Sequence, residues 1–160
     1  MQLLLAAVQA STLAADVQAS GDAVACTLPF SELTATVHAQ GIDEVVRGLT
    51  VEARVPAGEG RLELTPERGL GAAVAALREI EVDDATVDNA WVIRGDGPAL
   101  LLALLPALRA LALAAPVIHV EGEQLKVAFD RPVALIELGG RVHDALALWE
   151  RAASFRLGAA

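Results

Sequence analysis

The stretch VIHVEGEQLKVAF, residues 117–129, decides the fold because it carries the clearest local pattern in the chain. Two segments of alternating apolar and polar residues flank the dipeptide Gly122-Glu123. Glycine at the first central position suits a two-residue type II′ turn. The cross-strand pairs that this turn predicts are Val120 with Leu125, Ile118 with Val127, and His119 with Lys126. The sequence therefore predicts an antiparallel hairpin with one apolar and one polar face.

Alternating segments also precede the hairpin, at residues 32–40, 49–55 and 61–65. Each places apolar side chains on one face and polar side chains on the other, which is typical of antiparallel strands with one solvated face. We expect a consecutive meander in which Glu52 and Arg54 pair with the charged side chains of the following strand, Arg61 and Glu63. The remaining strands are predicted at residues 23–28, around 80–82 and at 91–94.

The most apolar window, residues 98–118, contains Arg109 as its only charge and Pro106 near its middle. Its length would suit a membrane span. A central arginine, however, costs about 2.5–3.5 kcal/mol on insertion, and proline kinks a helix. We interpret the window as a buried helix over 98–114, or as two short helices joined at Pro106. Asp96 is the expected N-cap, with Pro98 just inside the helix.

Helices are also predicted at both ends of the chain, over residues 2–18 and 141–156, and as one or two turns at 71–77. Together the patterns predict one α+β domain over residues 1–160. Its sheet is mainly antiparallel, with about six strands, and its helices pack chiefly on one face.

Composition excludes several classes of protein. The chain has 160 residues, 54% of them hydrophobic, which excludes intrinsic disorder. A net charge of −9 and only 3% aromatic residues argue against a nucleic-acid partner. A single cysteine, Cys26, excludes a disulfide framework. Residues 3–8 resemble the apolar core of a secretory signal, but no Lys or Arg precedes them, so we expect a cytoplasmic protein with no membrane attachment.

Candidate catalytic and metal-ligating residues do not form a recognised pattern. The segment 79–88 holds five carboxylates, which favours either a hard-cation site or a solvated turn, and the spacing of an EF-hand is absent. The histidines His38, His119 and His143 lack the short spacing of zinc ligands, and Cys26 is expected to be a small buried thiol. Gly95-Asp96-Gly97 only faintly resembles an anion-binding turn. We therefore predict no catalytic, cofactor or metal residues.

The helix over 98–114 is apolar on nearly all sides, so it must be covered on every side. The cover is either the rest of this chain or a second protein chain, because an exposed leucine patch is not tolerated in a free monomer. If a second chain provides it, the candidate interface residues are Leu101, Leu104, Leu105, Leu108 and Leu111.

Residues 79–96 and 104–109 show an acidic turn, a tryptophan-containing strand that ends in Gly-Asp, and a leucine-rich helix with an embedded proline. Over residues 60–130 this arrangement resembles an uncharacterised bacterial α+β domain, although Val87 stands where such sequences often have phenylalanine. The resemblance implies the fold class and no activity.

Three functions are expected in this order. The first is a non-catalytic soluble subunit that works through protein–protein contact, as a homo-oligomer or within a larger assembly. The second is a domain that binds a small hydrophobic ligand between the sheet and the helix at 98–114. The third is a metal-dependent enzyme that uses the acidic residues of segment 79–88.

Overall fold

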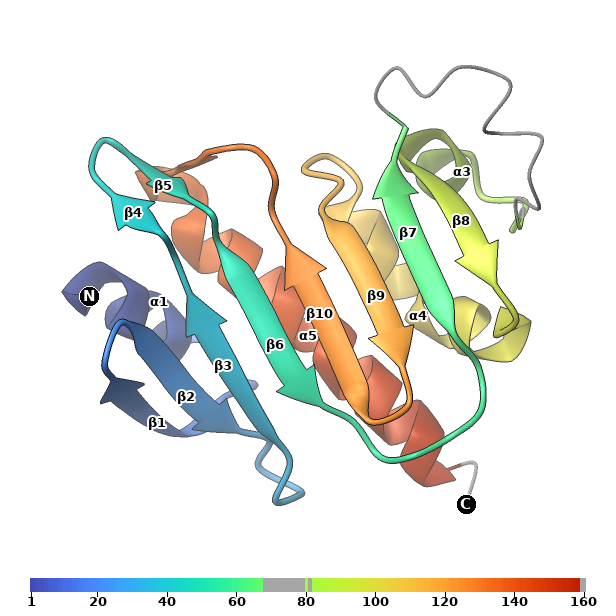
Figure 1. Cartoon of the computed structure of the whole chain (residues 1–160), viewed down its shortest axis with the longest axis horizontal. Coiled ribbons are helices and arrows are strands. Elements are labelled where there is room, and N and C mark those ends of the chain that lie inside the picture. Colours follow the sequence, from blue (N-terminus) through green and yellow to red (C-terminus); the bar gives the residue numbers. More distant parts are fainter. Residues whose placement is uncertain (68–79, 81, 159–160) are drawn as a thin grey trace.

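An eight-stranded sheet forms the centre of the computed structural model, which describes residues 1–67, 80 and 82–158 (Figure 1). The strand order is β1-β2-β3-β6-β10-β9-β7-β8, and all neighbours are antiparallel. The strands are β1 (Ala15–Ser20), β2 (Ala23–Thr27), β3 (Thr34–His38), β6 (Thr50–Arg54), β7 (Leu62–Pro66), β8 (Trp91–Gly95), β9 (Val117–Glu121) and β10 (Gln124–Ala128). The fold is α+β as predicted, with eight strands in the main sheet instead of about six.

A second, three-stranded sheet continues from one end of the main sheet. It contains β4 (Gly41–Ile42), β5 (Val45–Arg47) and β11 (Val133–Ala134), in the order β11-β5-β4. Because β4 follows β3 and β5 precedes β6, this small sheet is an extension of the β3–β6 pair, as Figure 1 shows.

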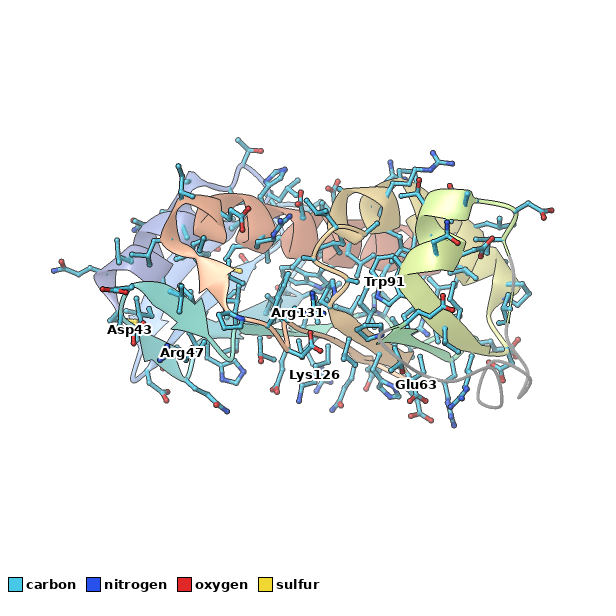
Figure 2. All side chains as sticks on the ribbon, turned by 90° about the horizontal axis from the view of Figure 1, so that it is seen from above. Asp43, Arg47, Glu63, Trp91, Lys126 and Arg131 are labelled. Atoms are coloured by element: carbon cyan, nitrogen blue, oxygen red, sulfur yellow. The ribbon has the colours of Figure 1, made fainter. Side chains whose placement is uncertain are left out.

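The helices all lie on one face of the main sheet (Figure 1). They are α1 (Gln2–Ala10), α3 (Ala85–Ala90), α4 (Pro98–Leu111) and α5 (Leu138–Gly158), with a short 3-10 turn, η1 (Leu135–Glu137), before α5. Figure 2 shows the helix layer on one side of the sheet, Trp91 between the two layers, and Lys126 and Glu63 projecting from the other side. Within the described residues, the molecule is therefore a two-layer sandwich in which no helix covers the second face of the sheet.

The core fills the space between the helix layer and the sheet. Trp91 and Trp149 are the largest fully buried side chains. Both indole N–H groups are satisfied, since Trp91 Nε1 donates to the carbonyl of Pro116 and Trp149 Nε1 donates to that of Arg54, each at 2.7 Å. A buried indole without a partner would be costly, so each bond fixes its ring against a specific strand or loop.

The predicted N-terminal helix over 2–18 is wrong in its second half. α1 ends at Ala10, Ser11 adopts an extended conformation, and residues 15–20 form β1. The side chain of Ser11 accepts a hydrogen bond from Leu13 N at 3.4 Å, a local bond that competes with helix continuation. Gly21, with φ of +62°, turns the chain from β1 into β2 rather than ending a helix.

The predicted meander of consecutive strands is also wrong, because β6 and β7 are not neighbours. The later hairpin β9–β10 lies between them, with β10 pairing to β6 and β9 pairing to β7. The connection over 55–61 carries a proline and two glycines and crosses the hairpin's end. Glu52 therefore pairs with Lys126 rather than with the next strand in sequence.

The apolar segment forms a single helix, α4, which ends at Leu111 rather than at residue 114. Pro106 lies inside this helix, on its exposed side. Because proline has no N–H, the carbonyl of Leu102 lacks its helical hydrogen bond, and Leu102 is itself exposed. The N-cap is Gly97 instead of Asp96. The Asp96 carboxylate accepts a hydrogen bond from Arg61 N at 2.7 Å, so it ties the turn to the start of β7.

The hairpin prediction is confirmed in all three cross-strand pairs. The strands predicted at 23–28, 32–40, 49–55, 61–65 and 91–94 are confirmed within a few residues, and α5 contains the helix predicted over 141–156. In the region of the strand expected around 80–82, Ile80 N donates to the carbonyl of Ile93 in β8 at 2.8 Å, and Val82 N donates to the Asp88 side chain. The helical turns predicted at 71–77 lie outside the described residues.

Candidate functional site

One face of the main sheet is left without a covering helix by the residues that the structure describes. Alternation along each strand sends every second side chain to this face. We define the central open face as the outward residues of the four middle strands, β3, β6, β10 and β9: Thr34, Thr36, His38, Thr50, Glu52, Arg54, Val117, His119, Glu121, Gln124, Lys126 and Ala128.

The strand register aligns the middle row of this face across four strands. Thr36 lies opposite Glu52, Glu52 opposite Lys126, and Lys126 opposite His119. Directly opposed side chains in a sheet have Cβ atoms about 4.5–5.5 Å apart. Glu52 is therefore held between a hydroxyl and an ammonium group by the backbone alone.

Charged side chains on the central open face form two separate groups of ion pairs. Glu52 Oε1 lies 3.5 Å from Lys126 Nζ and 3.8 Å from His38 Nε2. His119 Nε2 lies 3.2 Å from Glu121 Oε2. The Glu52 and Lys126 side chains are 53% and 54% exposed, so solvent screens these pairs and each contributes little to stability.

The central open face is neutral on a strongly acidic chain. Its two acidic residues, Glu52 and Glu121, balance its two basic residues, Arg54 and Lys126, so the whole net charge of −9 lies elsewhere. A shallow groove of about 410 Å³ runs along it. The groove is lined by Thr34, Thr36, Glu52, Ala53, Arg54, His119, Gln124, Leu125 and Lys126. This surface combines hydrogen-bonding groups of both kinds with paired charges.

A second hollow, of about 490 Å³, lies at the start of α4, at one end of the helix layer. Leu100 and Phe155 supply apolar lining, and Glu59, Asp96 and Arg156 supply the charges. It lies beside the loop at 57–60 rather than between the sheet and α4, where the predicted ligand pocket would have been.

Arg156 is the residue that the sequence reasoning missed. It is only 3% exposed, and its guanidinium donates to the carbonyls of Pro56, Gly60 and Gly122. Burial lowers the pKa of this guanidinium. Gly58 packs so closely that a Cβ there would lie 3.0 Å from Arg156 Cδ. Arg156 thus joins α5 to the loop after β6 and to the hairpin turn.

Four of the five leucines predicted as interface candidates lie in the core of this same chain. Leu101, Leu104, Leu108 and Leu111 have no exposed surface, and Leu105 is half-buried. Their cover comes from the sheet and from α5, the intramolecular alternative that the sequence left open. The exposed leucine of α4 is Leu102, at 59%, and a partner that reached the other four would have to displace the core.

Two of the three described carboxylates of the acidic segment, Asp84 and Asp88, bond to nearby backbone N–H groups. Asp84 caps α3 by accepting from Thr86 N and Val87 N, and its Oδ2 lies 2.6 Å from Arg109 Nε. The hydrogen bond from Arg109 holds the pKa of Asp84 below its usual range. Asp88 accepts from Val82 N and from Asp84 N. Glu79 and Glu81 lie outside the described residues. Among the residues that the structure describes, no group of three or more His, Cys, Asp or Glu side chains could hold a metal ion.

The remaining candidates are dispersed. His38 and His119 lie on the central open face, whereas His143, on α5, bonds Ser11 Oγ at 3.0 Å. Cys26 is buried, and burial raises the pKa of its thiol to about 11. The Ser11–His143 contact joins a hydroxyl to an exposed imidazole, but Ser11 itself is only 5% exposed.

Comparison with protein-family models, with curated proteins and with solved structures gives no match for this chain. The resemblance over residues 60–130 therefore stays a prediction. Among the described residues, no helix combines the length and apolar character needed to cross a membrane.

Proposed function

We propose that this protein is a non-catalytic assembly subunit that binds another protein chain through the central open face. The observation that carries the proposal is the neutrality of this face on a chain of net charge −9. Protein surfaces of like charge repel at long range. A neutral face that offers ordered donors and acceptors is where a second protein can approach at the lowest electrostatic cost.

The packing of the molecule also favours the central open face as the binding surface. The leucine-rich side of α4 is occupied by this chain, so those leucines are not available to a partner. The sheet, in contrast, presents eight strands on its open side (Figure 1). The proposal includes a cytoplasmic location, with which a single buried cysteine is compatible.

A site-specific photo-crosslinker tests the proposal in cells that produce the protein. We would place it at Thr36 in the groove and, as the matched control, at the exposed Ala110 on α4. We expect a protein adduct from Thr36 and none from Ala110, with the adduct identified by mass spectrometry and reproduced from purified components. Equal adducts from both positions, or none from Thr36, would contradict the proposal.

The second candidate function, binding of a small apolar ligand, is favoured by the hollow at the start of α4. Its volume of about 490 Å³ is within the range of small-molecule sites. Native mass spectrometry of the purified protein is the test: a bound molecule lost from an Ala99→Arg variant, but retained by Leu102→Arg, would support it.

A further inference from the structure

We propose that the partner of the central open face is a second copy of this chain, stacked face to face about a twofold axis between β6 and β10. The inference rests on the proposed function, because it names the occupant of the same surface. β6 and β10 are the fourth and fifth of eight strands, so an axis between them gives the two sheets their greatest overlap.

The strand register makes this arrangement complementary in charge. An axis parallel to the strands brings β6 opposite β10 of the partner, and β3 opposite its β9. In the middle row, Glu52 then lies over Lys126 of the partner subunit, and Thr36 lies over His119 of the partner subunit. The two Glu52–Lys126 pairs form a square of four alternating charges.

The row nearer the hairpin turn fits equally well, since Arg54 comes to lie over Gln124 of the partner subunit. Neither row places two charges of the same sign opposite each other. A twofold axis at right angles to the strands and through the middle row would instead place Glu52 over Glu52 of the partner subunit, which repels. The charge pattern thus favours the axis parallel to the strands over that arrangement.

The size of the face bounds the strength of the association. Eight strands spaced about 4.8 Å apart, each about five residues long at about 3.3 Å per residue, cover roughly 600 Å². Two copies would bury at most about 1,200 Å² if all eight strands overlapped, and about half of that through the four strands of the central open face alone. The first figure is the lower limit for a specific interface. We therefore expect a reversible dimer that weakens as salt screens the half-exposed charges.

Complementary single variants test the contact between copies. We would purify Lys126→Glu and Glu52→Lys and measure mass by sedimentation velocity over a concentration series. Wild type is expected to dimerise, and each variant alone to dimerise about tenfold more weakly or worse, because its stacked faces carry four like charges. An equimolar mixture should restore the dimer, since one variant then presents two acidic residues and the other two basic ones.

Two controls separate the contact from folding and from net charge. Circular dichroism checks that both variants stay folded, as expected for side chains that are more than half exposed. Arg151→Glu on the exposed side of α5 makes the same charge change as Lys126→Glu and should leave dimerisation within about twofold of wild type.

The outcomes also separate this inference from the proposed function. Wild type that stays monomeric, a mixture that stays monomeric, or an Arg151→Glu variant that also loses the dimer would overturn the inference. In those cases, an adduct between Thr36 and a different protein would leave the proposed function standing. Absence of any Thr36 adduct would contradict both.

Discussion

The two faces of the eight-stranded sheet differ in burial and in the kind of side chain that they carry. The face toward the helices is built from side chains with almost no exposed surface, including Leu62, Leu64 and Ile93. The open face carries charged side chains that remain about half exposed, such as Glu52 and Lys126. Burial of apolar surface contributes far more than exposed ion pairs. The covered face therefore determines stability, and the open face is free to be specialised for contact.

Leu104→Ala on α4 should show the largest effect, because it opens a cavity in the covered face. Leu104 has no exposed surface, and substitutions of this kind cost about 3 kcal/mol, within a range of roughly 2–5 kcal/mol. Urea unfolding followed by circular dichroism measures the loss. The exposed Leu102→Ala is the control and should stay within about 0.5 kcal/mol of wild type. Equal losses for both variants would mean that α4 is not a core helix.

Arg156→Met tests the polar contact at the edge of the covered face. Methionine fills a similar volume but leaves the carbonyls of Pro56, Gly60 and Gly122 without their donor. Leaving these part-buried acceptors without their donor should cost about 1–2 kcal/mol. Arg151→Met, on the exposed side of α5, should change the free energy of unfolding by less than about 0.5 kcal/mol. If the two variants unfold alike, Arg156 does not join α5 to the loops.

The contrast between the faces also explains what the sequence could predict. Alternation identified the strands and the outward position of His38 and His119, because period-two patterning reports which side chains are buried. The same pattern does not indicate the order of the strands in the sheet. Nothing local in β6 indicates that its neighbour is β10 rather than β7, since both pairings bury the same apolar side chains. The central open face depends on that order and could not be assembled from sequence.

Two other predictions were wrong because the deciding contacts lie outside the segment itself. Residues 15–20 have helical spacing with the preceding leucines, but pairing with β2 prevails over that weak propensity. From the sequence, Arg156 is expected to be a solvated residue in the last turns of a helix. In the fold, its guanidinium instead donates to three backbone carbonyls. In both cases the deciding partner is distant in sequence or in a different element.

Asp84→Asn tests an ion pair on the helix side and its pH dependence. Asparagine keeps the cap on α3 but removes the charge that binds Arg109. Because the pKa of Asp84 is lowered in the folded state, its stabilisation is complete above the ordinary carboxyl pKa and is lost as the pH falls through the lowered value. We expect Tm to fall by a few degrees at pH 7, and the two proteins to converge in acid.

A control for the Asp84 comparison is Asp83→Asn, which changes the same charge on the neighbouring, exposed residue. Its Tm should stay close to that of wild type at every pH. A difference between wild type and Asp84→Asn that persists unchanged in acid would show that the effect comes from the geometry of the cap and not from the charge.

Glu52→Gln should have the smallest effect on stability, although it lies at the centre of the open face. The change removes the ion pairs with Lys126 and His38 while keeping the shape of the side chain. Exposed pairs of this kind contribute about 0–1 kcal/mol, so unfolding in urea should shift by less than about 0.5 kcal/mol. The dimer, in contrast, loses two contacts at once, because the twofold axis repeats the Glu52–Lys126 pair. A variant that folds like wild type and associates more weakly would separate the two faces experimentally; a stability loss comparable to that of Leu104→Ala would show that the open face also holds the fold together.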